Sequence, residues 1–92
     1  MKQLALTDTL SFRLENDNKK LRLIIADGDK ELACRKETLS NLRCFIQSNQ
    51  SSLFKGRLQL YRQDNTIIIT LKGQPAGAVS IADLNNALTS LA

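Results

Sequence analysis

The chain has 92 residues, of which 42% are hydrophobic and 24% charged, with a formal net charge of +4. A chain of this length and composition forms one domain with one core, and no apolar run is long enough for a transmembrane helix or a signal peptide, so we expect a cytoplasmic protein without membrane contact. The lack of histidine excludes Ser-His-Asp and Cys-His hydrolases and removes the usual nitrogen ligand of zinc.

The first half of the chain begins with a predicted hairpin. Apolar and polar residues alternate over residues 11–15 and 20–26, on either side of an Asn/Asp-rich break at 16–19, which is the pattern of a half-buried hairpin. Gly28, between two aspartates, predicts a second tight turn. A third short strand is expected over about residues 31–35, and the residues before Thr9 fit either an extra strand or a frayed end.

From Lys36 the apolar period becomes that of a helix. Leu39, Leu42 and Ile46 follow the spacing i, i+3, i+7, and Phe45 lies beside them. They predict one apolar helix face. The polar residues 47–52 that follow predict a surface loop, because they are too few to separate domains.

The second half repeats the same order of elements. Residues 57–62, a turn at 63–65 and residues 66–72 predict a second hairpin, and residues 78–79 fit a short third strand. Ser80 and Asp83 have the spacing of a helix N-terminal cap. An apolar helical stripe then runs through Ile81, Leu84, Leu88 and Leu91.

These elements predict an α+β fold. We expect one antiparallel sheet built from two β-hairpin(-β)-α units, related by a pseudo-twofold repeat over about residues 9–49 and 56–92, with two helices packed on one face. Residue identity between the halves is negligible, so the repeat is predicted from the order of periodicities. At the level of element order this plan is similar to that of sheet-based single-strand binders of the PUR and Whirly types, and no residue motif links the chain to them.

The alternation also predicts a basic surface on the sheet face opposite the helices. We expect five basic residues and one acid there, because most other acids fall in turns or at a helix start. Lys19, Lys55 and Arg62 are expected at its margins, and one tyrosine could stack a base. The candidate nucleic-acid-binding residues are Arg13, Lys20, Arg22, Arg57, Tyr61 and Lys72.

Two functions are consistent with this face. The first is sequence-independent binding of nucleic acid, which a pI near 9.4 favours. The alternative is a protein-interaction or regulatory module, acting as a homodimer or on another protein, because Ile24 and Ile68 are expected among the polar residues of the face. An aromatic content of 4% counts against single-strand binding, and solvated sheet faces also carry basic residues for solubility.

No catalytic, metal or cofactor site can be assembled from the sequence. The carboxylates beside Gly28 lack the further oxygen ligands of an EF-hand, and residues 73–77 lack the lysine of a P-loop. Cys34 and Cys44 form no C-x-x-C pair, so we expect reduced, buried thiols. The chain is therefore expected to be non-enzymatic and to hold no cofactor or metal.

Overall fold

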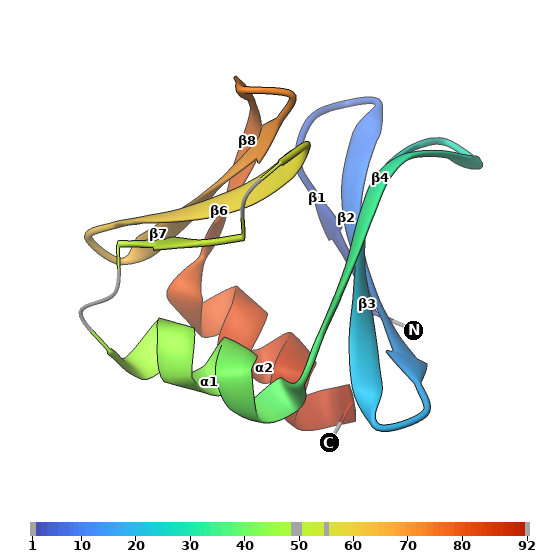
Figure 1. The fold of residues 1–92 in the computed structure, drawn as a ribbon. Coiled ribbons are helices and arrows are strands. Elements are labelled where there is room, and N and C mark those ends of the chain that lie inside the picture. The colour runs from blue at the N-terminus through green and yellow to red at the C-terminus, as the bar shows by residue number, and fades with distance from the viewer. Residues whose placement is uncertain (1, 49–50, 55, 92) are drawn as a thin grey trace.

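The structure, a computed structural model, describes residues 2–48, 51–54 and 56–91. It has an α+β fold of two antiparallel four-stranded sheets and two helices, with four strands before each helix (Figure 1). None of the helices within these ranges is long and apolar enough to cross a membrane.

We call the two sheets sheet A and sheet B. In each sheet the strands are neighbours in their order along the chain. Sheet A consists of β1 (Lys2–Ala5), β2 (Leu10–Asp17), β3 (Lys20–Asp27) and β4 (Lys30–Glu37). Sheet B consists of β5 (Ser52–Leu53), β6 (Leu58–Gln63), β7 (Thr66–Leu71) and β8 (Gln74–Ser80). The helices are α1 (Leu39–Gln47) and α2 (Ile81–Leu91).

Tight turns fix the register of the strands. Each turn contains a residue in the left-handed region: Asn18 (φ 59°), Gly28 (φ 60°), Asp64 (φ 53°) and Lys72 (φ 54°). Asn, Asp and Gly tolerate this conformation, whereas most other residues are strained there. Because such turns leave little freedom for slippage, they hold the apolar positions of neighbouring strands on the same face.

Side-chain caps fix the ends of both helices. Thr38 accepts a hydrogen bond from the Asn41 N–H (3.1 Å) at the start of α1. Ser80 Oγ accepts from the Asp83 N–H (3.0 Å) before α2, so the cap predicted at this position is confirmed. Arg62 donates to the Phe45, Ile46 and Ser48 carbonyl oxygens at the end of α1, and is therefore committed to a structural role.

One hydrophobic core joins both sheets and both helices. The inner faces of the sheets bury the residues predicted from the alternation, such as Leu14 and Ile67, and the helices add Leu42, Phe45 and Leu88. All five side chains are at most 1% exposed. Full burial of a side chain of this size stabilises the fold by about 1.5–3 kcal/mol.

The prediction of a single sheet is wrong. Strands β1–β4 pair among themselves, and so do β5–β8. In Figure 1 the helices lie side by side, below sheet B and next to the lower part of sheet A, instead of on one face of one sheet. Periodicity identifies strands and their apolar faces, but it does not tell which strands pair across the helix that separates the two halves.

The strands are also more extensive than predicted. Residues 2–5 form a strand that pairs with β2, the third strand of the first half covers residues 30–37, and β8 begins four residues before Ala78.

The loop after β1 contacts β8 at Gly77, where an added Cβ would lie 2.6 Å from Leu6 Cβ. Glycine at this position therefore permits a close approach of the two halves of the chain.

Candidate nucleic-acid interface

The six candidate residues are divided between the two sheets. Arg13, Lys20 and Arg22 belong to β2 and β3 of sheet A, and the other three lie in or next to sheet B. Of these, Tyr61 lies on β6, and the two cations lie just outside the strands. The predicted surface is therefore not one basic face but two outer faces of different charge.

The outer face of sheet A is the face that points away from the core. Register and alternation place on it Gln3, Ala5, Ser11, Arg13, Glu15, Asp17, Lys20, Arg22, Ile24, Ala26, Glu31, Cys34 and Lys36. Four of these are basic and three are acidic, which leaves one net positive charge. The prediction of one acid on this side was wrong, because β2 extends to Asp17 and because Glu31, although within the expected third strand, was not assigned to this face.

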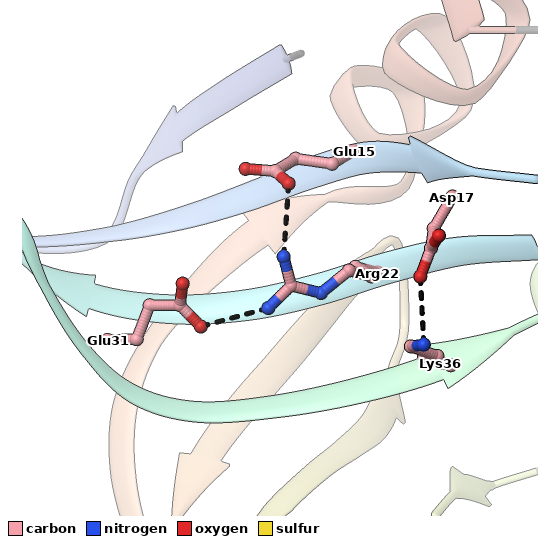
Figure 2. Close-up of polar contacts among 5 residues, drawn as sticks. All are labelled: Glu15, Asp17, Arg22, Glu31 and Lys36. Atoms are coloured by element: carbon pink, nitrogen blue, oxygen red, sulfur yellow. Dashed lines mark hydrogen bonds and ion pairs between the residues drawn. The ribbon is translucent and has the colours of Figure 1, made fainter.

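Arg22 lies at the centre of this face and is held by two carboxylates. Its Nη1 atom is 3.3 Å from Glu15 Oε2 on β2, and its Nη2 atom is 3.1 Å from Glu31 Oε1 on β4. Figure 2 shows the guanidinium lying between the two acids. A hydrogen bond to Cys34 and the charges of Glu31 and Glu15 raise the pKa of Arg22 above its ordinary value.

A third ion pair crosses the same face. Lys36 Nζ on β4 is 2.9 Å from Asp17 Oδ2 on β2, so that the contact spans β3 (Figure 2). The hydrogen bond from Lys36 lowers the pKa of Asp17. Two of the four basic residues on this face, Arg22 and Lys36, thus contact carboxylates of the same face.

Arg13 and Ile24 form the less charged end of this face. Arg13 Nη2 donates to the Gly28 carbonyl oxygen, and its Nε atom is buried without a hydrogen-bond partner in the described chain. Ile24 was expected to project from the face, but it is 1% exposed. It lies between Arg13 and Cys34 on the neighbouring strands, whose side chains flank it. Ile24 therefore offers no apolar surface to a partner protein.

The outer face of sheet B differs because its strand residues carry no charge. The register places on it Ser52, Gln59, Tyr61, Gln63, Thr66, Ile68, Thr70, Pro75, Ala78 and Ser80. Tyr61 is 41% exposed, and its hydroxyl donates to Gln59 Oε1. Ile68 lies opposite Tyr61 on β7 and is half-buried. The hydrogen bond to Gln59 restrains the Tyr61 ring, which remains accessible to solvent.

Two candidate cations meet at one end of sheet B. The Lys72 N–H donates to the Arg57 carbonyl oxygen (2.7 Å), which continues the pairing of Leu58 with Leu71 by one step. Both side chains are exposed, and neither has an ion pair within residues 2–48, 51–54 and 56–91. Tyr61 lies four residues after Arg57, or about 13 Å along an extended strand.

The other predicted positions have varied outcomes. Lys19 is exposed in the β2–β3 turn, and Lys55 lies outside the described residues.

The prediction of buried thiols is wrong, since Cys34 and Cys44 are both free and exposed. Cys34 lies at an outward position of β4, and Cys44 lies between the buried positions of α1; the low polarity of a thiol does not decide which way it faces.

No metal site is formed by the described part of the chain, where no three His, Cys, Asp or Glu residues are grouped suitably. Comparison with known proteins gave no matching family model, no similar curated protein and no similar solved structure.

Proposed function

We propose that this protein binds nucleic acid without sequence preference, and that it takes single strands on the outer face of sheet B. The observation that carries the proposal is the arrangement of Arg57, Lys72 and Tyr61. Two cations that form no ion pair within the described residues adjoin a strand surface that holds an exposed aromatic ring and no acid. The function involves no catalysis, cofactor or metal.

The three side chains supply the two interactions that single-strand binding needs. Arg57 and Lys72 would neutralise backbone phosphates, and Tyr61 would stack an unpaired base. Base–aromatic stacking contributes about 1–3 kcal/mol per base and tolerates any base. Because Gln59 accepts from the Tyr61 hydroxyl, the ring is restrained before binding and loses less conformational freedom.

The net charge of +4 supports this function at longer range. A positive protein attracts a polyanion and raises the association rate at low salt. The ion pairs of sheet A reduce what that sheet contributes, because Arg22 and Lys36 already contact carboxylates. Sheet B supplies two exposed cations, Arg57 and Lys72, that form no ion pair within the described residues and lie at one end of the sheet that carries Tyr61.

The proposal includes the pseudo-twofold repeat of residues 9–49 and 56–92. Its support is the common element order of the two halves, four strands followed by a helix, and their common strand order. An internal repeat of this kind would give the chain two equivalent outer sheet faces, which have since acquired different charges.

A second candidate function is homodimerisation through the same face of sheet B. It is favoured by the uncharged strand surface around Tyr61 and Ile68, which a second copy could cover without burying an unpaired charge. Sedimentation of the isolated chain distinguishes the two candidates. A dimer that dissociates on changing Ile68 to Lys would favour this second function.

The test of nucleic-acid binding is fluorescence anisotropy with labelled random single-stranded and double-stranded oligonucleotides at low salt. Changing Tyr61 to Ala should weaken single-strand binding more than duplex binding, because the bases of a duplex are already stacked. The control is Tyr61→Phe, which keeps the ring and loses only the hydroxyl contact with Gln59. Equal losses on both substrates, or no binding by the unmodified chain, would contradict the proposal.

A further inference from the structure

The two sheets place their cations in different surroundings, and Arg22 is the extreme case. Its guanidinium lies between Glu15 of β2 and Glu31 of β4, at 3.3 and 3.1 Å (Figure 2). Arg57, in contrast, has no carboxylate partner in the described chain. We call the group Glu15, Arg22 and Glu31 the Arg22 clamp.

We infer that Glu15 and Glu31 determine which sheet binds nucleic acid. They prevent binding on the outer face of sheet A, so that each protein chain binds one single-stranded nucleic acid, on sheet B. This inference rests on the proposed function, because it concerns where the same ligand is accepted. It assigns a specificity role to two acids that lie away from the proposed binding surface.

The geometry of the guanidinium supports this role. Arginine recognises a phosphate through parallel hydrogen bonds from its terminal nitrogens. In the clamp, both terminal nitrogens of Arg22 already contact carboxylates. Each terminal nitrogen keeps a second N–H, but a phosphate that approached Arg22 would lie beside the carboxylates of Glu15 and Glu31, whose like charge opposes it.

The clamp is also partly shielded from water. The Arg22 and Glu15 side chains are 29% and 33% exposed, and that of Glu31 is 48% exposed. Salt screens partly buried pairs less than fully exposed ones. The Arg22–Glu15 contact is therefore weakened less by salt than a fully exposed ion pair.

The neighbouring cations of sheet A do not compensate. Lys36 contacts Asp17, and Arg13 donates to the Gly28 carbonyl. Of the four basic residues on this face, Lys20 alone has neither an ion pair nor a hydrogen bond within the described residues. A single-stranded nucleic acid lying across this face would meet three carboxylates and few hydrogen-bond donors that are free to contact its phosphates.

The experiment compares the E15Q/E31Q variant with the D27N/D29N variant. Both changes remove two negative charges, but only the first releases Arg22. Asp27 and Asp29 are exposed at the β3–β4 turn and form no ion pair within the described chain, so their removal controls for net charge. Each protein is titrated with a short single-stranded oligothymidylate over a range of salt, and the perturbed amides are mapped by NMR.

We expect E15Q/E31Q to bind a second oligonucleotide, with new amide perturbations on β2 to β4. Its affinity should fall more steeply with salt, by about 0.7 in the log–log slope for each phosphate that Arg22 now contacts. D27N/D29N should bind one oligonucleotide, with perturbations on β6 and β7. If the double glutamine variant does not fold, E31Q alone should show the change in the same direction.

The outcomes separate this inference from the proposed function. If the unmodified chain binds and E15Q/E31Q behaves like D27N/D29N, the role of the acids is overturned and binding on sheet B stands. If only E15Q/E31Q binds, and does so on sheet A, the closing role of the acids stands and the assignment to sheet B fails. If neither binds, both are overturned.

Discussion

The Lys72 N–H donates to the Arg57 carbonyl oxygen at 2.7 Å, and this one hydrogen bond fixes two cations at the same end of sheet B. Backbone hydrogen bonding, unlike a salt bridge, leaves both charges available for a ligand. The positive φ of Lys72 (54°) belongs to the turn that closes β7 onto β8. The fold therefore sets the position of this pair, although no side-chain contact joins them.

The shared core predicts that both helices are needed for stability. Leu42 on α1 is 1% exposed and Leu88 on α2 is 0% exposed. Changing either to Ala should lower the free energy of unfolding by about 2–5 kcal/mol, as expected for large-to-small core substitutions. Urea denaturation measures the loss. A midpoint equal to that of the unmodified chain would show that the helix concerned does not pack on the core.

The close approach of Gly77 and Leu6 predicts a second sensitive position. An alanine Cβ at residue 77 would lie 2.6 Å from Leu6 Cβ, so β8 or the loop after β1 must shift. We expect Gly77→Ala to cost about 1–3 kcal/mol, the range for overpacking. Gly28→Ala is the control, because its φ is also positive but no atom lies within 4 Å of the added Cβ. Equal losses in the two variants would contradict the close approach.

The exposure of both cysteines predicts their reactivity. Cys34 and Cys44 are free and exposed, so a disulfide reagent such as Ellman's reagent should modify both in the folded protein, without prior unfolding. Variants with one cysteine changed to Ala assign each reaction. Modification that begins only when urea unfolds the chain would show that the thiols are buried, as the sequence suggested.

The Asp17–Lys36 pair predicts a loss of stability in acid. Because Lys36 lowers the pKa of Asp17 below its ordinary value of 3.8, the unfolded chain binds a proton more readily than the folded one. The contribution of the pair is therefore present above pH 3.8 and is lost as the pH falls through the lower, folded pKa. Urea denaturation at several acidic pH values should show a flatter dependence for Asp17→Asn. An unchanged acid limb would mean that the pair does not form in solution.

The sequence predicted the strands and helices well, because apolar residues that recur every two or every 3.6 residues mark the buried face of a strand or of a helix. The inner positions Leu14, Leu23 and Ile69 are all fully buried as expected. The pairing of strands could not be predicted, since β4 and β5 are separated by a helix and neither periodicity nor composition records their neighbours. Two sheets resulted where one was expected.

The candidate site was predicted less completely for a related reason. Counting charges along a strand does not show which side chains contact each other. Glu31 contacts Arg22 from the neighbouring strand and Asp17 contacts Lys36 across β3, so that these contacts depend on the register of β2, β3 and β4. The spacing of Arg57 and Tyr61, which is local in sequence, was predictable.

The central claim, that Arg57 and Lys72 contact phosphates, is tested most directly by the salt dependence of single-strand binding. The R57Q/K72Q variant should bind more weakly, and its log–log slope should become shallower by about 1.4, or about 0.7 for each phosphate that is no longer neutralised. The control is K2Q/K30Q, which removes two exposed lysines of sheet A with no ion pair in the described chain. The account predicts a near-normal slope for this control, whereas equal slopes for the two variants would contradict it.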